Sequence, residues 1–477
     1  MNKKSIKKNY LYNLLYQIIT ILLPIITTPY ISRVLGVEKI GIYSYAISIS
    51  AYFILFGSLG IALYGQREIA FCQNDKNKYS KAFWEIFFLR VITMSISLII
   101  FYFTFGLHSE YSLYYKILTL ELIGNCIDIS WFFQGLEEFK KTVIRNIIVK
   151  LISVLCIFLF IKTQNDLYKY FIIYVLSILL GNLSLWFYLP QYVAKVKLKK
   201  LKIRKHLKPT LSLFIPQIAI QIYTMLDKTM IGALISDKSE VGFYAQGEKI
   251  IKLLLTIITS LGTVMMPRIA FTYSQGEYDK IKEYMNKSFR LVFLLAFPLI
   301  FGICVIAENF VPIFFGAGYD RVVIIMQLLS SIILLIGLSN VIGTQYLLPT
   351  KRQKEYTISV VVGSLVNLVF NSILIPKFGA VGATIGTIIA EFTVTTIQIY
   401  FTRKNFEFKK ILKLSKNYIV SAICMFIICL LLKKVIKNNL FSLIAQVIVG
   451  MISYGIILIL IKDKFVKEII NKILKRS

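Results

Sequence analysis

Histidine, paired cysteines and phosphate-binding loops are scarce or missing in this 477-residue sequence. Its two histidines, His108 and His206, stand far apart in the chain, and the six cysteines form no CxxC pair. These patterns argue against a zinc or haem site and against disulfides, so we expect no metal and no cofactor. The sequence also lacks a GxxxxGK[ST] loop, which excludes a built-in ATPase of that type. No catalytic residue is expected.

Charged residues are also scarce, at 17% of the chain, whereas hydrophobic residues make up 57% and the mean hydropathy is +0.71. A soluble domain could not cover so much apolar surface. Apolar runs of about 20 residues can each cross a hydrocarbon core of about 30 Å. We therefore predict an all-α integral membrane protein with about 14 transmembrane helices. The predicted spans are residues 11–34, 42–63, 82–105, 112–133, 142–162, 168–189, 209–235, 241–266, 289–315, 321–347, 356–375, 381–402, 416–434 and 440–461.

Acidic residues are few. The chain has 24 Asp and Glu residues and 55 Lys and Arg residues, which gives a net charge of +31. The basic residues are concentrated in the N-terminal segment, the even-numbered connections and the C-terminal segment. Since basic loops remain on the cytoplasmic side, we predict that both termini are cytoplasmic. The protein is then a multi-pass protein of the inner (cytoplasmic) membrane, and its charge does not indicate nucleic acid as a partner.

Two basic cytoplasmic segments stand out. The connection at about residues 190–208 includes QYVAKVKLKKLKIRKHLKP; it is either a topology anchor attracted to anionic lipid or a docking site for a phosphorylated substrate or a partner enzyme. Residues 274–290, SQGEYDKIKEYMNKSFR, have the spacing of a short interfacial helix.

Polar residues form stripes along several predicted spans. Ser359, Gly363, Asn367 and Asn371 recur every four residues before a short outside connection at Pro376. Comparable stripes contain Asn13 and Gln17, then Glu121, Asn125 and Asp128, then Gln217, Gln221 and Lys228, and finally Thr384, Thr387, Glu391, Thr395 and Gln398. Such stripes indicate either a central aqueous cavity or ordinary hydrogen bonding between helices.

Charged residues inside spans are harder to explain by packing, because each costs roughly 2.5–3.5 kcal/mol on insertion scales. They are Arg90, Glu121, Asp128, Asp227, Lys228, Glu248, Lys249 and Glu391. Two adjacent pairs, Asp227 with Lys228 and Glu248 with Lys249, could neutralise each other. Adjacent helical residues point about 100° apart, so that pairing would need help from another helix.

Two segments in the halves of the chain are alike. RVLGVEKIGIYSYA (residues 33–46) and GALISDKSEVGFYA (residues 232–245) each close one span, cross a short charged loop and enter the next span. Six predicted spans separate them. An even number of spans between copies means that the two halves enter the membrane in the same orientation, as in a parallel repeat.

Several motifs occur together in an order that resembles the polysaccharide flippases of the multidrug/oligosaccharidyl-lipid/polysaccharide exporter superfamily, which handle O-antigen and other repeat units of lipopolysaccharide and capsule. They are TPYISRVLGVEKIGIYSYA, WFFQGLEEFK, MIGALIS after Asp227 and Lys228, GFYAQGEKI, and SLVNLVFNSILIPKFGAVGATIGTIIAE. Each motif alone is loose, whereas their order over nearly the whole chain is specific.

The resemblance implies an N-lobe of spans 1–6 (residues 1–200), a C-lobe of spans 7–12 (residues 201–405), and spans 13 and 14 with the tail (residues 406–477). It implies alternating access that carries an undecaprenyl-diphosphate-linked oligosaccharide from the inner to the outer leaflet, driven by an ion gradient or the membrane potential. A diphosphate needs cations. The expected substrate-binding cations are Arg33, Arg90, Lys228 and Lys249, the coupling or charge-balancing acids are Asp128, Asp227, Glu248 and Glu391, and the cavity-lining polar residues are Asn13, Gln17, Gln217, Gln221, Asn367 and Asn371.

Other functions remain open on the sequence alone. A lipid II flippase of the same superfamily would share the architecture. A multidrug extruder is disfavoured because no dominant acidic and aromatic cation trap is present, and an integral-membrane glycan-processing enzyme would normally carry a large outside loop. The expected partners are lipid-linked oligosaccharide and membrane lipids, with a glycan polymerase and glycosyltransferases as further candidates.

Overall fold

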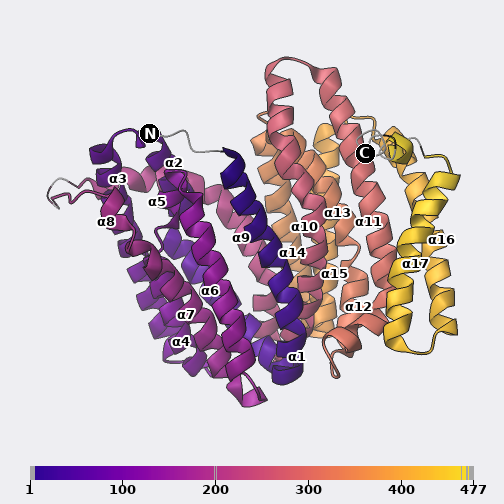
Figure 1. Cartoon of the computed structure of the whole chain (residues 1–477), viewed down its shortest axis with the longest axis horizontal. Coiled ribbons are helices and arrows are strands. Elements are labelled where there is room, and N and C mark those ends of the chain that lie inside the picture. The colour runs from indigo at the N-terminus through magenta and orange to yellow at the C-terminus, as the bar shows by residue number, and fades with distance from the viewer. Residues whose placement is uncertain (1–5, 198, 200, 464, 469–470, 472–477) are drawn as a thin grey trace. The chain divides into compact units, whose positions relative to one another are not determined.

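The computed structural model describes the chain except for residues 1–5, 198, 200, 464, 469–470 and 472–477, and the side chains of residues 6–17, 215–217, 219–220, 222–223 and 263 are also outside the described part. Over the described residues the fold is built from helices, without a strand (Figure 1). The α-helices are α1 (Ile6–Ser58), α2 (Ile61–Cys72), α3 (Lys76–Phe101), α4 (Ser112–Cys126), α5 (Ser130–Gly135), α6 (Phe139–Phe160), α7 (Leu167–Trp186), α8 (Leu189–Tyr192), α9 (Leu207–Leu234), α10 (Ser239–Ser274), α11 (Tyr278–Phe314), α12 (Asp320–Leu329), α13 (Ile332–Ser339), α14 (Gln353–Phe378), α15 (Ala380–Thr402), α16 (Phe408–Val435) and α17 (Asn439–Leu460). Short 3₁₀ or π turns are η1 (Tyr102–Gly106), η2 (Gln164–Asp166), η4 (Ile203–His206) and η5 (Asn340–Leu347).

The helices agree with the predicted membrane architecture. In the described part, 11 helical stretches are long and apolar enough to cross a membrane, and the first, Ile18–Cys72, covers two predicted spans. Gly36 (φ 76°, ψ 168°) interrupts α1 between those two spans, in a conformation that glycine adopts readily. With α4 continued by α5, and with α9, the helices match the predicted spans. The all-α, multi-span fold is confirmed.

The chain divides into two compact units. Unit 1 comprises residues 1–232 and 237–239, and unit 2 comprises residues 233–236 and 240–477. Unit 1 therefore holds α1 to α8 and nearly all of α9, and unit 2 holds nearly all of α10 and α11 to α17. The lobe boundaries at residues 200 and 405 remain predictions, because these units group helices by compactness and not by the internal repeat.

Unit 1 has an aromatic core at the junction of α2, α3 and α5. Phe83, Trp131, Phe132 and Phe133 are fully buried there. The ring centroid of Phe83 lies 5.7 Å from that of Trp131 and 4.9 Å from that of Phe132. Each aromatic pair of this kind contributes about 0.5–1.5 kcal/mol beyond its burial. The cluster fixes the short helix α5, and with it the break between α4 and α5.

Unit 2 contains a one-residue joint between α14 and α15. Gly379 (φ 58°, ψ −130°) separates the two helices, and Pro376 lies within the last turn of α14. Glu240, at the start of α10, accepts a hydrogen bond from the Ala380 backbone nitrogen at 2.7 Å. A Cβ atom at Gly379 would lie 2.2 Å from the Glu240 carboxylate. The connection predicted near Pro376 therefore exists, but it is shorter than expected, because α14 continues past the proline.

The segment expected to form a separate interfacial helix, residues 274–290, is instead mostly the first part of α11, which continues unbroken for 37 residues. At 1.5 Å per residue α11 is about 55 Å long, against a hydrocarbon core of about 30 Å. In Figure 1 the hairpin of α10 and α11 extends past the neighbouring helix ends of unit 2. The final two helices, α16 and α17, pack against each other and against α11.

Candidate functional site

Arg90, on α3 of unit 1, is a buried cation whose hydrogen-bonding capacity is only partly used. Its side chain is 3% exposed, and Nη2 lies 3.8 Å from Asp128 Oδ2. Nε donates to the Asn125 carbonyl oxygen at 2.8 Å. Within the described part of the chain, the buried Nη1 atom has no hydrogen-bond partner. Because a guanidinium carries five N–H donors, Arg90 retains donors for a further acceptor.

The break between α4 and α5 explains why Arg90 donates a hydrogen bond to a backbone carbonyl at the end of α4. The helix ends at Cys126 and resumes at Ser130, and backbone at membrane depth must find partners when it leaves the helix. Arg90 takes the carbonyl of Asn125 and Trp186 Nε1 donates to the carbonyl of Ile127 at 2.8 Å. Asp128 in turn accepts from the Ser130 backbone nitrogen at 2.9 Å. Broken helix and buried charge thus stabilise each other.

Glu121 is a second buried charged residue of unit 1. It lies on α4, one helical turn before Asn125. Its carboxylate accepts hydrogen bonds from Ser50 Oγ at 2.9 Å and from Tyr174 OH at 2.7 Å. The polar face predicted for the fourth span, with Glu121, Asn125 and Asp128, therefore faces protein partners from α1, α3 and α7. A buried carboxylate held by two hydroxyl groups can exist with or without its proton, which is the property that a coupling group needs.

The remaining predicted residues of unit 1 occupy varied environments. Arg33 is exposed, three residues before the Gly36 interruption of α1. Asp227 on α9 is buried and its neighbour Lys228 is half-buried. Gln221 is exposed. The side chains of three further predicted cavity-lining residues lie outside the described part of the chain: Asn13, Gln17 and Gln217.

In unit 2, Glu248 on α10 is buried and lies 2.6 Å from Lys252 Nζ, one helical turn away. Sequence reasoning had paired Glu248 with its neighbour Lys249, which is half-buried. The i, i+4 spacing places Lys252 on the same face as Glu248, which adjacency does not do. Glu391 on α15 is buried. The structure therefore adds Lys252 to the charged residues of this helix.

Asn367 and Asn371 on α14 are fully buried, and Asn371 Nδ2 donates to Asn367 Oδ1 at 3.1 Å. Their helix packs closely on α15 through small residues: a Cβ atom at Gly363 would lie 2.2 Å from Val394. On the same interface Gln398 Nε2 donates to Ser359 Oγ at 3.0 Å. In this structure these residues of the α14 stripe lie in contacts within or between helices, and a cavity-lining role for Asn367 and Asn371 stays a prediction.

A buried cluster that the sequence did not reveal joins η4 to α2 and α3 in unit 1. His206 is fully buried, with Nδ1 2.7 Å from Tyr64 OH and Nε2 2.9 Å from Glu85 Oε2. Glu85 also accepts from the Lys202 backbone nitrogen at 2.7 Å. The only sequence signal was a histidine within a run of lysines. Among the described residues, no group of three or more His, Cys, Asp or Glu is placed to hold a metal ion.

Comparisons with known proteins place the sequence among polysaccharide biosynthesis proteins. A sequence profile described as polysaccharide biosynthesis protein matches residues 6–273, and one described as MatE matches residues 213–373. The chain is 29% identical to the "Putative O-antigen transporter" of Escherichia coli (strain K12), over 85% of this chain and 98% of that protein. It is 23% identical to the capsular polysaccharide biosynthesis protein CapF of Staphylococcus aureus, over 84% of this chain and 100% of that protein.

Among solved structures, the fold resembles that of the lipid II flippase MurJ in an inward closed conformation. The TM-score is 0.74 at 19% identity, over 94% of this chain and 99% of MurJ. At that identity the likeness concerns the fold alone. Because the family profile covers more than half of the sequence, the chain belongs to the polysaccharide biosynthesis protein family.

Proposed function

We propose that this protein is a flippase that moves undecaprenyl-diphosphate-linked oligosaccharide repeat units from the inner to the outer leaflet of the cytoplasmic membrane by alternating access. The observation that carries the proposal is the match over 98% of the Escherichia coli relative, whose name assigns O-antigen transport to that protein. The capsular polysaccharide relative, matched over its whole length, supports the same substrate class. These relatives are named for transport and polysaccharide biosynthesis, which supports a transporter and not an enzyme.

The buried charges suit such a substrate. A diphosphate brings two or more negative charges into a low-dielectric site, where it needs cations to replace water. Arg90 offers a guanidinium with an unused Nη1 atom, and we assign it the first contact with the diphosphate. Arg33, Lys228 and Lys249 are proposed as further contacts, with Asp128, Asp227, Glu248 and Glu391 balancing charge. In this role Asp128 keeps Arg90 from holding the anion too tightly.

Alternating access needs two rigid parts and a driving force. Each compact unit of the chain has its own buried apolar residues, which supports rigid-body movement of two parts of the chain. The sequence has no phosphate loop for ATP, so the proposed drive is an ion gradient or the membrane potential. Glu121, held by Ser50 and Tyr174, is the group that we propose to bind a coupling proton.

A lipid II flippase is the second candidate, favoured by the fold similarity to MurJ. Lipid II has the same undecaprenyl diphosphate carrier but a peptide-bearing disaccharide, so the buried cations alone do not separate the two substrates. The whole-length sequence match to the O-antigen relative supports the oligosaccharide. Substrate choice is therefore tested by function and not by geometry.

Deleting the gene in its host tests the proposed function. We expect lipid-linked oligosaccharide to accumulate on the cytoplasmic face of the inner membrane, measured by its resistance to an externally added glycosidase in intact spheroplasts. The wild-type gene should restore export. The same strain should be assayed for lipid II on each face. Accumulation of lipid II and normal export of the oligosaccharide would overturn the proposal in favour of the second candidate.

A further inference from the structure

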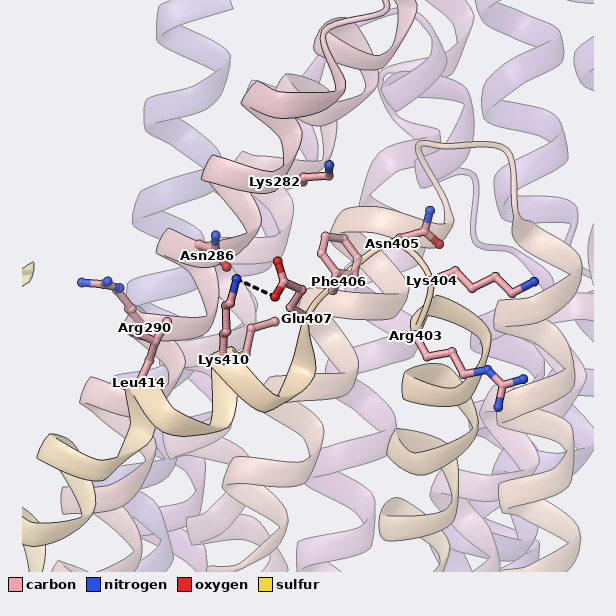
Figure 2. A pocket seen from close by; sticks show the side chains of 11 residues that line it. Lys282, Asn286, Arg290, Arg403, Lys404, Asn405, Phe406, Glu407, Lys410 and Leu414 are labelled. Atoms are coloured by element: carbon pink, nitrogen blue, oxygen red, sulfur yellow. Dashed lines mark ion pairs between the residues drawn. The ribbon is translucent and has the colours of Figure 1, made fainter.

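A basic pocket of about 490 Å³ lies within unit 2, apart from the intramembrane charges described above. Three segments line it: α11, the connection between α15 and α16, and the first turns of α16. In Figure 2, Asn286 of α11 lies beside Lys410 and Glu407, and Lys282 lies further along the same helix. Phe406 is next to Glu407, and Arg403 and Lys404 extend on the other side. Its volume lies in the range of about 300–1,000 Å³ that is typical of sites for small organic groups.

Cations dominate the rim of the pocket. Five basic side chains contribute to its lining against a single acid, Glu407: Lys282, Arg290, Arg403, Lys404 and Lys410. Lys410 lies 2.6 Å from Glu407, and both side chains are more than 70% exposed. Ion pairs this exposed contribute little, at about 0–1 kcal/mol, so Lys410 can exchange its partner for a stronger anion. The charge of the pocket therefore suits a phosphate group.

Apolar residues also line the pocket, and hydrogen bonds hold the connection between α15 and α16 in place. Phe406 and Ile411 are buried apolar residues of its lining. Arg352 fixes the connection from outside the pocket, because its Nη1 atom donates to Asn405 Oδ1 and its Nη2 atom to the Phe401 carbonyl oxygen, both at 2.8 Å. A lining that is partly apolar and partly cationic matches a phosphate that is esterified to an apolar group better than it matches a free ion.

The pocket lies at the level where lipid headgroups are expected. Its residues follow the end of α15 at Thr402 and include the first turns of α16 from Phe408. The lining residues of α11 fall in the first four turns of a helix that is longer than the hydrocarbon core is thick. The connection belongs to the basic, even-numbered set predicted to be cytoplasmic. Basic pockets between transmembrane helices on that side bind anionic headgroups.

We propose that this pocket binds the phosphate headgroup of an anionic glycerophospholipid from the cytoplasmic leaflet. Lys282 and Lys410 contact the phosphate, and Phe406 and Ile411 contact the glycerol backbone. Bound there, the lipid joins α11 to α16, and so attaches the last two helices of unit 2 to the rest of that unit. This inference does not depend on which lipid-linked saccharide the protein transports.

The test measures binding of headgroup-labelled phosphatidylglycerol to the full-length protein, purified in a neutral detergent, with phosphatidylcholine as the neutral comparison. We expect tighter binding of phosphatidylglycerol. The double variant Lys282→Gln/Lys410→Gln should weaken it roughly thirty-fold, since each basic residue near a membrane surface contributes on the order of fivefold. The control Lys280→Gln/Lys287→Gln removes two exposed lysines from the same helix, paired with Glu277 and Glu283 outside the pocket, and should bind normally.

A variant that is expected to bind more tightly distinguishes an effect on the pocket from misfolding, because misfolding would only weaken binding. Glu407→Gln removes the acid that competes for Lys410, and it should tighten phosphatidylglycerol binding several-fold. Three results would overturn the proposal: equal losses in the pocket and control variants, displacement of the lipid by millimolar inorganic phosphate, which indicates a free-anion site, or displacement by undecaprenyl diphosphate at lower concentration than by phosphatidylglycerol, which indicates a site for the transported lipid.

Discussion

At the scale of single residues, two buried charged side chains of unit 1, Arg90 and Glu121, have different kinds of hydrogen-bond partner. Arg90 shares its guanidinium between Asp128 and a backbone carbonyl, whereas the Glu121 carboxylate accepts hydrogen bonds from two hydroxyl groups. A buried cation with unused N–H donors can bind an anion, and a buried acid held by neutral groups can exchange a proton. The two roles proposed for them follow from these different surroundings.

Comparing Arg90→Ala with the double variant Arg90→Ala/Asp128→Ala separates the role of Arg90 in substrate binding from its role in folding. The single variant should lower glycan export by about ten- to a hundredfold, because it removes a charge-assisted contact to the diphosphate, and it should also reduce the amount of folded protein, because Asp128 loses its cation. The double variant Arg90→Ala/Asp128→Ala should recover the folded protein without export. Protein amount is measured by fluorescence-detected gel filtration, and export by surface glycan.

Two further variants serve as comparisons for Arg90. Arg90→Lys keeps the charge but loses the planar fork, so it should retain part of the export activity. Lys116→Ala removes an exposed cation from α4 and should change neither quantity. Wild-type export by the double variant would place the diphosphate elsewhere in the protein.

We expect His206 to make the stability of the protein depend on pH. Burial lowers the pKa of His206 below its ordinary value of 6.5, while Glu85 acts in the opposite direction. Between the lowered pKa and 6.5 the unfolded chain binds more protons than the folded one, so stability falls as the pH drops below about 6.5 and is constant above it for this group. The slope for one proton is at most about 1.4 kcal/mol per pH unit.

The expected result is a lower unfolding temperature at pH 5.5 than at pH 7.5 for the purified protein, with a flatter dependence in His206→Gln. His108→Gln, which replaces the exposed histidine, is the matched control and should keep the wild-type dependence. An unchanged dependence in His206→Gln would remove this histidine from the acid response.

At the scale of elements, unit 2 is shaped by contacts that allow helices to meet closely. The joint between α14 and α15 is the single residue Gly379, and the Glu240 carboxylate caps the first turn of α15. Glu240 also forms an ion pair with Arg321, at the start of α12. One buried acid thus fixes the starts of three helices, α10, α12 and α15, and a side chain at Gly379 would displace it.

Gly379→Ala should destabilise the protein by roughly 2–4 kcal/mol, the sum of backbone strain and the loss of the helix cap. Gly276→Ala is the matched control. Gly276 also has a positive φ, of 74°, but no atom lies within 4 Å of its added Cβ, so only strain of about 1–2 kcal/mol is expected. Denaturant unfolding in detergent measures both. Equal losses would show that the Glu240 cap contributes nothing.

At the scale of the whole molecule, orientation in the membrane is predicted from charge and not from packing. Lys and Arg crowd the connections at alternate ends of the helices, and the pocket lined by Lys282, Arg403 and Lys410 belongs to one of these basic ends. If orientation were reversed, both the lipid site and the direction of transport proposed here would be reversed with it.

Reporter fusions test the orientation. A green fluorescent protein fused after Ser477 or within the connection at Asn405 should fluoresce, because both positions are predicted to be cytoplasmic. Alkaline phosphatase fused at Lys437, between α16 and α17, should be active outside. Phosphatase activity at Ser477 would overturn the topology, and with it the count of spans.

The sequence by itself determined that the protein is a helical membrane protein, because hydropathy and helix length are local properties that the bilayer enforces. It located most spans to within a few residues, and it identified Arg90, Asp128 and Glu121 because a charge in an apolar run is visible without a fold. It erred where a boundary depends on neighbours: α14 continues through Pro376, and α11 continues through the segment expected to be a separate helix.

Only the tertiary structure decided which of these residues meet. Arg90 reaches Asp128 because α5 is fixed by an aromatic core from α2 and α3, and His206 reaches Tyr64 and Glu85 across more than a hundred residues of chain. Glu248 lies against Lys252 and Asn367 against Asn371 because helical geometry and close packing select those partners. Pairing across helices depends on the packing of whole elements, and no local pattern in the sequence encodes it.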